Sequence, residues 1–168
     1  MYTLAHRDMD KAYFMTAEGD CRVVTATHEH VEDMYPFIRK VDQLECACMG
    51  ETPRAAMLRA LDKDDMTLTA LDAQGVPMAM FGVGRVVGQA YIWCLGTDAV
   101  KDNAYQFLKS SRKWTQLLTK PYGATFNYVH QDNDVAIRWL KFCGAKFIRA
   151  LVFQDQSFYE FIIPYRHV

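Results

Sequence analysis

The strongest constraint on the fold lies in residues 125–147, where a strand pattern, a helix pattern and a second strand pattern follow one another. Residues 125–129 form a strand-like run of β-branched and aromatic side chains. Asn133 is suited to cap the next helix, because its side chain accepts a hydrogen bond from a free N–H of the first turn. Gly144 predicts the end of this helix, and a new apolar run begins at Phe147.

Apolar side chains within this helix recur three or four residues apart. Such spacing places them along one side of a helix, and we expect that side to face the core. The members of the predicted inward stripe are Val135, Trp139 and Phe142, with Ala136 and Leu140 beside them.

The rest of the chain divides into further strand and helix patterns. Strands are predicted at residues 21–26, 66–71, 76–83, 90–95, 125–130, 147–153 and 158–163. Helices are predicted from His28 after the cap Thr27, with Val31, Met34 and Ile38 inward, from Pro53 after the cap Thr52, and over 102–119. An antiparallel meander therefore precedes the crossover units, which predicts an α+β fold with a mixed sheet and helices on both faces.

Length and composition limit the classes of function. At 168 residues the chain is expected to be one domain. Its net charge of −1 argues against nucleic acid as a partner, although Lys109, Arg112 and Lys113 could form a local basic patch or a solvated helix face. No apolar run reaches the roughly 18 residues that span a membrane. Charged residues lie close to Met1, where a signal peptide would have an apolar region. Five cysteines without framework spacing fit reduced thiols, so we expect synthesis in the cytoplasm.

The order of elements resembles the GCN5-related N-acetyltransferase (GNAT) superfamily, and within it the GNAT-like proteins encoded by short-tailed bacteriophages among their virion genes. The resemblance covers about residues 20–165, with residues 1–19 as an N-terminal extension, in a single domain of residues 1–168. It implies a mostly antiparallel sheet of about seven strands with about four helices. Besides the N-x-x-A-I-R-x-L-x-x-x-G pattern that starts at Asn133, four pieces carry it: Gln43-Leu44-Glu45-Cys46 with Pro53, residues 76–83, Trp93-Cys94-Leu95-Gly96-Thr97, and Trp139-Leu140-Lys141 before Gly144.

The resemblance also implies where acetyl-CoA would bind. Main-chain groups of Trp93, Cys94 and Leu95 would pair with the pantetheine arm, the N–H groups of Gly96 and Thr97 would reach the diphosphate, and Asn133 could bond either cofactor or substrate. The expected glycine-rich diphosphate loop has one glycine here and carries Asp98 and Asp102. Carboxylates at a helix start suit the helix dipole but repel an anion.

Candidate catalytic residues are few. His130 lies at the carboxyl end of a predicted strand and has a side chain suited to general base work, although a lone histidine beside Gln131 and Asp132 is more often a solvated loop residue. Tyr91 is a titratable group of the preceding strand, and Asn133 matches the family pattern while also serving as a helix cap. The resemblance places a tyrosine proton donor seven residues after the asparagine, where this chain has Leu140.

Two other patterns offer candidate binding sites, one for a metal ion and one for a nucleotide. His28, His30, Cys46 and Cys48 offer two nitrogens and two sulfurs, but their spacing is poor for zinc, so no metal site is predicted. Residues 82–88 are rich in glycine but lack both the nucleotide-loop spacing and a following helix, which predicts a flexible hairpin tip.

Two functions follow from these patterns. The first is a GNAT-fold phage protein with degenerate catalytic motifs that acts through protein contacts, inside the virion or on a host target. The second is an active acetyl-CoA-dependent N-acetyltransferase with an atypical diphosphate loop. Aromatic residues concentrate after residue 146 and would suit a protein partner, including further copies of this chain.

Overall fold

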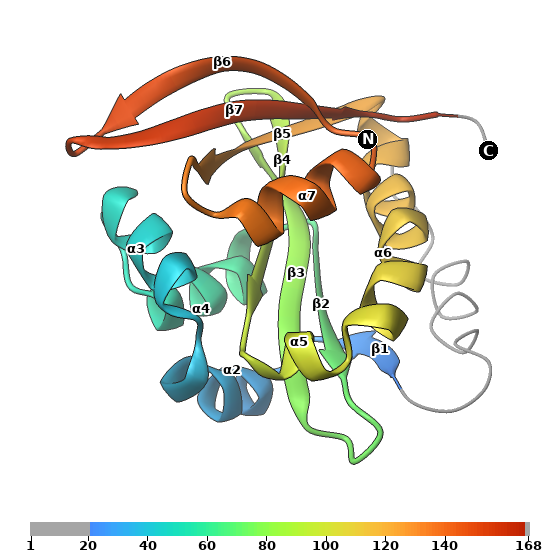
Figure 1. The fold of residues 1–168 in the computed structure, drawn as a ribbon. Coiled ribbons are helices and arrows are strands. Elements are labelled where there is room, and N and C mark those ends of the chain that lie inside the picture. Colours follow the sequence, from blue (N-terminus) through green and yellow to red (C-terminus); the bar gives the residue numbers. More distant parts are fainter. Residues whose placement is uncertain (1–20, 167–168) are drawn as a thin grey trace.

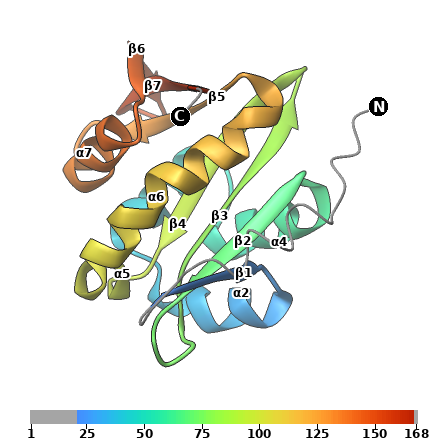
Figure 2. The same ribbon diagram turned by 90° about the vertical axis from the view of Figure 1, so that its right-hand side faces the viewer.

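A computed structural model describes residues 21–166, and these form one seven-stranded sheet with helices on both faces (Figures 1 and 2). The strand order is β1-β2-β3-β4-β5-β7-β6, and every neighbouring pair is antiparallel except β4 and β5. The predicted α+β class and mixed sheet are confirmed. The strands are β1 (Arg22–Thr25), β2 (Met66–Leu71), β3 (Pro77–Val86), β4 (Gln89–Gly96), β5 (Ala124–His130), β6 (Lys146–Phe153) and β7 (Gln156–Pro164). The expected extension at residues 1–19 lies outside the described residues.

Tight turns build the first half of the sheet. Between β2 and β3, the Asp72 side chain accepts hydrogen bonds from the N–H groups of Gln74 and Val76, both at 2.9 Å. Between β3 and β4, Val87 and Gly88 both have positive φ, as a two-residue hairpin turn requires. The predicted flexible tip is thus confined to these two residues, because β3 continues to Val86 and includes the upstream glycines.

One face of the sheet is covered by α2 (His28–Met34), α3 (Lys40–Cys48) and α4 (Pro53–Lys63). Their apolar side chains form a core with β3 and β4 that includes Val31, Met34, Met57 and Met80. The caps Thr27 and Thr52 accept from main-chain N–H groups as predicted. The predicted continuation of the first helix to Ile38 is wrong, because α2 ends at Met34 and a short 3-10 helix, η1 (Tyr35–Phe37), contains Pro36.

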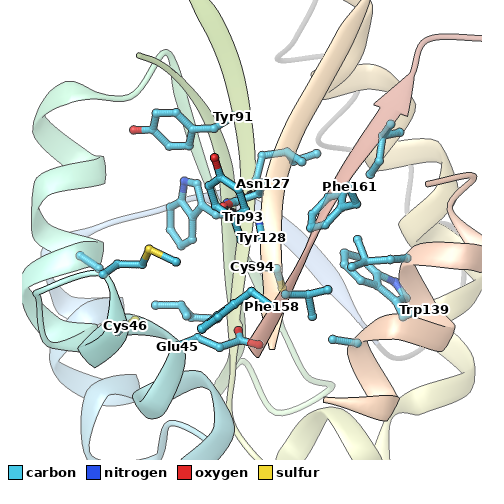
Figure 3. A pocket seen from close by; sticks show the side chains of 18 of the residues that line it. Glu45, Cys46, Tyr91, Trp93, Cys94, Asn127, Tyr128, Trp139, Phe158 and Phe161 are labelled. Carbon is cyan, nitrogen blue, oxygen red and sulfur yellow. Dashed lines mark hydrogen bonds between the residues drawn. The ribbon is translucent and has the colours of Figure 1, made fainter. Parts of the chain in front are cut away.

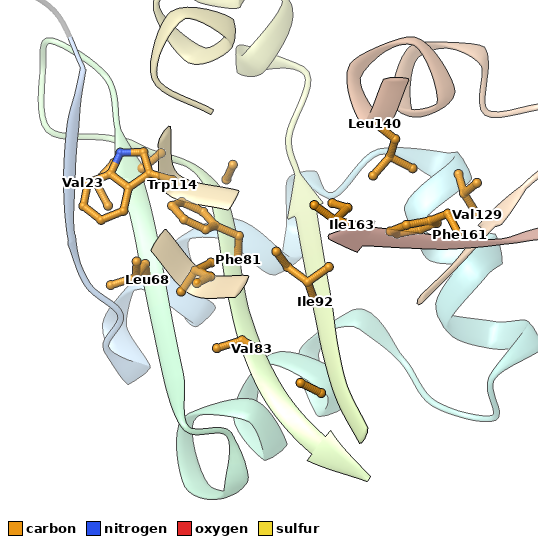
Figure 4. Packing of buried hydrophobic residues seen from close by; sticks show 14 of the residues in the cluster. Val23, Leu68, Phe81, Val83, Ile92, Trp114, Val129, Leu140, Phe161 and Ile163 are labelled. Carbon is orange, nitrogen blue, oxygen red and sulfur yellow. The ribbon is translucent and has the colours of Figure 1, made fainter. Parts of the chain in front are cut away.

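The other face is covered by α5 (Ala99–Asp102), α6 (Ala104–Thr119) and α7 (Asp134–Phe142), with the 3-10 helix η2 (Lys120–Tyr122) after α6. Trp114 and Leu118 of α6 and Leu140 of α7 pack against strand residues such as Phe81 and Ile163 (Figure 4). The helix predicted over roughly 102–119 is confirmed as α6, and Asn103 separates it from the short preceding helix α5.

The inward face of α7 differs from the predicted stripe. Val135 and Phe142 are 49% and 44% exposed, whereas Leu140 is buried and Ala136 and Trp139 pack partly against the core. The two candidate stripes are offset by one position, and the core takes the one that contains Leu140. Trp139 belongs to the inner group, as predicted. No described helix is long and apolar enough to span a membrane.

Candidate functional site

The main cleft lies where the parallel strands β4 and β5 separate. Within residues 21–166, Tyr91 and Phe126 are the single pair in register between these strands. Beyond that pair a cavity of about 270 Å³ opens, bordered by α3, α4, α7 and β7 as well as by the two strands (Figure 3). Its lining includes Glu45, Cys46, Glu51, Arg59, Tyr91, Trp93, Cys94, Leu95, Asn127, Tyr128, Trp139, Leu140, Phe158 and Phe161.

The edge of β4 supplies main-chain hydrogen-bonding groups to this cleft. The Thr97 N–H donates to the Met78 carbonyl at 2.9 Å, and bonded pairs alternate along an antiparallel ladder. Consequently Ile92, Cys94 and Gly96 turn their N–H and C=O groups away from β3 and towards β5. These three residues are the ones whose main-chain groups lie on the cleft side of β4.

Asn127 closes the narrow end of the cleft. Its side-chain Nδ2 donates to the Ile92 carbonyl at 2.7 Å, and its Oδ1 accepts from the Tyr128 N–H at 2.8 Å. One amide side chain therefore joins β4 to β5 at the point where their backbones part. Cys94 lies further along the cleft, between this contact and the end of β4.

Helix α3 and the residues before it close the wide end on the β4 side. The Arg39 N–H donates to the Gly96 carbonyl at 3.0 Å, and Ile38 forms an antiparallel bridge with Thr97. The Gly96 N–H donates to Asp42 Oδ2 at 2.9 Å. Asp42 is 1% exposed and also accepts from Arg39, through Nε at 3.0 Å and Nη2 at 2.7 Å. Both main-chain groups of Gly96 are therefore taken by this chain.

Glu45, one helical turn after Asp42, closes the β5 side. Its Oε1 accepts from the His130 N–H at 2.9 Å and from Asn133 Nδ2 at 3.0 Å. Burial raises the pKa of Glu45, and these two hydrogen bonds offset part of that rise. The two carboxylates of α3 thus bind the ends of the two strands that border the cleft.

The loop after β4 is the predicted diphosphate site, and several of its N–H groups bond within the chain. Thr97 donates to Met78, Ala99 to the Thr97 hydroxyl at 3.3 Å, and Lys101 to the Asp98 carbonyl at 3.0 Å. The side chains of Asp98 and Lys101 form an exposed ion pair at 3.0 Å. A diphosphate needs free N–H donors and an open electropositive helix end. The residues present do not fit that group.

Of the predicted cofactor-binding residues, Trp93, Cys94 and Leu95 line the cavity, while Gly96, Thr97 and Asn133 are buried beside it. The Cys94 thiol has a pKa raised to about 12, chiefly by burial and then by the nearby Asp42 carboxylate. It is therefore a neutral thiol near pH 7. Asn133 caps α7, as predicted, since its Oδ1 accepts from the Ala136 N–H at 3.2 Å.

Tyr91 lines the cleft, but its hydroxyl is held by other side chains. It donates to Asp64, which also accepts from Trp93 Nε1 at 2.7 Å, and it accepts from Arg59 Nη1 at 3.3 Å. Burial, followed by the hydrogen bond to Asp64, raises the pKa of Tyr91. The phenol keeps its proton near neutral pH and directs it at a carboxylate rather than into the cavity.

His130 is 4% exposed and is not part of the cavity lining. Its Nδ1 accepts from the Asp132 N–H at 3.1 Å, which leaves the proton on Nε2 to donate to Gln156 at 3.0 Å. Both ring nitrogens are thus engaged. The alternative of a solvated loop histidine is wrong, because the ring is buried and packs edge-on against Phe158 at 5.2 Å.

The sequence patterns did not point to Asp42, Arg39, Asn127 or Asp64. Each acts through a partner distant in sequence, as with Asp42 and Gly96, which are 54 residues apart. The one available signal was the spacing of Asp42 and Glu45, which places two carboxylates on one side of a helix. Within residues 21–166, no three His, Cys, Asp or Glu side chains are grouped so that they could hold a metal ion.

No protein-family model and no curated protein matches this chain in sequence. Solved structures do match it. An acetyltransferase of the GNAT family from Bacillus anthracis has a TM-score of 0.66 at 8% identity, over 87% of this chain and 95% of that one. Spermidine N-acetyltransferase from Vibrio cholerae, in complex with CoA and spermine, has 0.65 at 11% identity over 86% and 95%. AAC(6')-Ib, in complex with ribostamycin and coenzyme A, has 0.63 at 14% identity over 87% and 94%. The chain therefore has the GNAT fold.

Proposed function

We propose that this chain is a GNAT-fold protein that acts through protein contacts and does not transfer an acetyl group. One observation carries the proposal: the segment from Ile38 to Glu45 occupies the main-chain groups of Gly96 and His130 at the wide end of the cleft. Those are the strand ends beside which the family resemblance places the cofactor. In this chain a protein segment binds them.

A cofactor at the wide end of the cleft would have to displace buried contacts of α3. Asp42 is fully buried between a guanidinium and a main-chain N–H, and breaking such a pair costs several kcal/mol. An incoming diphosphate would also meet the carboxylate of Asp98 at the start of α5. Both contributions oppose anion binding at this end of the cleft.

The available chemistry supports the same proposal. Tyr91 directs its proton at Asp64, both nitrogens of His130 are bonded, and Cys94 is a neutral thiol. The position of the family's tyrosine proton donor is Leu140, a buried aliphatic side chain in the cavity wall. Among the residues predicted to be catalytic, none directs a free proton-accepting atom at the reactive end of the cleft.

The proposed setting is a tailed bacteriophage, with the protein made in the host cytoplasm and either packaged in the virion or directed at a host target. This rests on the segments of the chain that resemble phage-encoded GNAT-like proteins. Mass spectrometry of purified particles would test packaging, since a packaged protein copurifies with the capsid after nuclease and detergent washes.

A second candidate, an active acetyl-CoA-dependent N-acetyltransferase, is favoured by a specific observation. The Cys94 main chain faces a cavity of about 270 Å³ whose walls are largely apolar, which suits a pantetheine arm. Two similarly folded enzymes are in complex with CoA. In this alternative the diphosphate would lie outside the loop that follows β4.

Thermal unfolding with and without acetyl-CoA separates the two candidates. Ligand at a hundredfold excess over its Kd adds about 2.7 kcal/mol of stability, which is a clear rise in Tm. We expect no rise in Tm of the wild-type protein at millimolar acetyl-CoA. If the loop after β4 itself cannot hold the diphosphate, the Asp42→Asn variant should also show no rise in Tm. A rise in the wild type would contradict the proposal. In that case Tyr91→Phe, His130→Ala and Asn133→Ala would show which predicted residue supports turnover.

A further inference from the structure

The surface formed by α6 and α7 has a charge opposite to that of the chain as a whole. α6 carries three basic side chains and no acidic one, and α7 carries two basic and one acidic, so the pair has a formal charge of +4 on a chain of net charge −1. All five basic side chains are exposed, and none forms an ion pair within residues 21–166. They are Lys109, Arg112, Lys113, Arg138 and Lys141.

These side chains form one continuous surface. The three of α6 are spaced three and four residues apart and share a side of the helix. The Arg112 guanidinium lies 5.2 Å from the centre of the Phe142 ring on α7, and Phe107 packs against Trp139 at 6.0 Å between the helices. Exposed apolar side chains lie among the cations, namely Tyr105 (74%), Leu108 (39%), Val135 (49%) and Phe142 (44%). We call this the α6–α7 surface.

The opposite face of the sheet carries a complementary surface on α2 and η1. α2 has three acidic side chains and no Lys or Arg. Glu29 and Asp33 are exposed and four residues apart, so they share one side of the helix, while Glu32 pairs with Arg54 at 2.6 Å. The next residues expose two aromatic rings, Tyr35 at 42% and Phe37 at 68%. We call these residues of α2 and η1 the α2–η1 surface.

We propose that the α6–α7 surface of one copy binds the α2–η1 surface of a second copy. This rests on the proposed function, in which the chain acts through protein contacts. A symmetric contact of the α6–α7 surface with itself would place five cations against five cations. The head-to-tail contact instead places basic and aromatic groups against acidic and aromatic ones. Because the pair then keeps one free surface of each kind, association continues into rings or chains.

The proposed contact is electrostatic and small, so it depends on salt and protein concentration. We would measure sedimentation velocity over a range of protein concentrations, at about 0.05 M and about 0.5 M salt, where the Debye length falls severalfold. We expect the wild-type protein to associate as its concentration rises at low salt, and to dissociate at high salt.

Charge-reversal variants identify the surfaces. Lys113→Glu with Arg138→Glu lowers the formal charge of the α6–α7 surface from +4 to zero, and Glu29→Lys with Asp33→Lys changes that of α2 from −3 to +1. Each double variant should weaken self-association at least about tenfold, because the attraction between opposite charges is then lost. Mixing the two double variants should restore pairing, since the unchanged α2–η1 surface of the first can bind the unchanged α6–α7 surface of the second. The matched control is Lys120→Glu with Lys146→Glu, which makes the same charge change outside the α6–α7 surface.

Three outcomes would overturn the inference: a wild-type protein that stays monomeric at low salt, association that the reversals leave unchanged, or a mixture that does not reassemble. Binding of duplex DNA by a monomeric wild-type protein would likewise assign the basic surface to another class of partner. The acetyl-CoA measurement is independent of all of these. A monomer that does not bind acetyl-CoA would remove this inference and leave the proposed function with a different partner.

Discussion

The two strands that border the cleft are bound to the same helix in different ways. At β4, Asp42 faces the guanidinium of Arg39 and accepts the Gly96 N–H. At β5, Glu45 accepts only neutral donors, from His130 and Asn133, and burial raises its pKa. Both carboxylates lose hydration, but only one has an opposite charge beside it. The surroundings of each carboxylate, rather than its place on α3, decide whether the contact depends on an ion pair or on hydrogen bonds alone.

Removing the ion-paired carboxylate should have the largest effect. Asp42→Ala leaves Arg39 and the Gly96 N–H without their buried partner, which should lower the free energy of unfolding by about 3–5 kcal/mol. Urea unfolding measures this through the shift in midpoint at constant m-value. Asp42→Asn is the control, because it keeps one acceptor oxygen and should cost less. A loss under about 1 kcal/mol would mean that the contact at β4 does not stabilise the fold.

Removing Glu45 should cost less than removing Asp42. Glu45→Ala leaves two donors unpaired, the His130 N–H and the Asn133 amide, and each unsatisfied buried group costs about 1–3 kcal/mol before water reaches it. The same urea experiment gives the comparison directly. If Glu45→Ala destabilised the protein more than Asp42→Ala, the ranking of the two strand ends would be reversed.

Variants of Asn133 separate the stability that comes from capping α7 from the stability that comes from the contact with Glu45. Asn133→Ala removes both the cap of α7 and the hydrogen bond to Glu45, and losing a cap costs about 1 kcal/mol. Asn133→Ser keeps a capping oxygen and should recover most of that cost. A double-mutant cycle of Glu45→Ala with Asn133→Ala should give a coupling energy of about 0.5–1.5 kcal/mol. Strict additivity would show that the two side chains do not interact.

The smallest expected effect is a dependence on pH at the β5 end. The pKa of Glu45 is raised in the folded state, so above its ordinary value near 4.5 the folded protein binds more protons than the unfolded one. Stability from this group is therefore full below that pH and is lost as the pH rises through the folded pKa. Glu45→Gln cannot titrate, so its stability relative to the wild type should rise over this window. A difference that stays constant with pH would exclude titration of Glu45.

Much of the fold could be predicted because local signals agreed with the tertiary structure. The caps at Thr27, Thr52 and Asn133 and the turn at 72–75 act through neighbouring residues, so the sequence displays them directly. Helix α3 was missed because it buries Asp42, Cys46 and Cys48 and has no regular apolar stripe. In α7, two apolar stripes lie side by side, and only packing against β5 and β7 decides between them.

The candidate site was less predictable than the fold. Trp93, Cys94 and Leu95 were found because the family resemblance marks the central strand. The roles of Asp42 and Glu45 depend on the main-chain N–H groups of Gly96 and His130, which any residue type except proline would supply. A main-chain partner leaves no trace in the sequence. The occupied strand ends could therefore be recognised only from the structure.

The single registered pair between Tyr91 and Phe126 has a mechanical consequence. Strands β1–β4 and strands β5–β7 each form a continuously bonded leaf, and few main-chain bonds join the leaves. A pulling force applied across the sheet would meet its least main-chain resistance between β4 and β5, where the Asn127 amide, the two α3 carboxylates and the apolar core under α6 and α7 hold the two leaves together. Separation of the leaves would thus begin with these side-chain contacts, before either leaf lost its own main-chain hydrogen bonds.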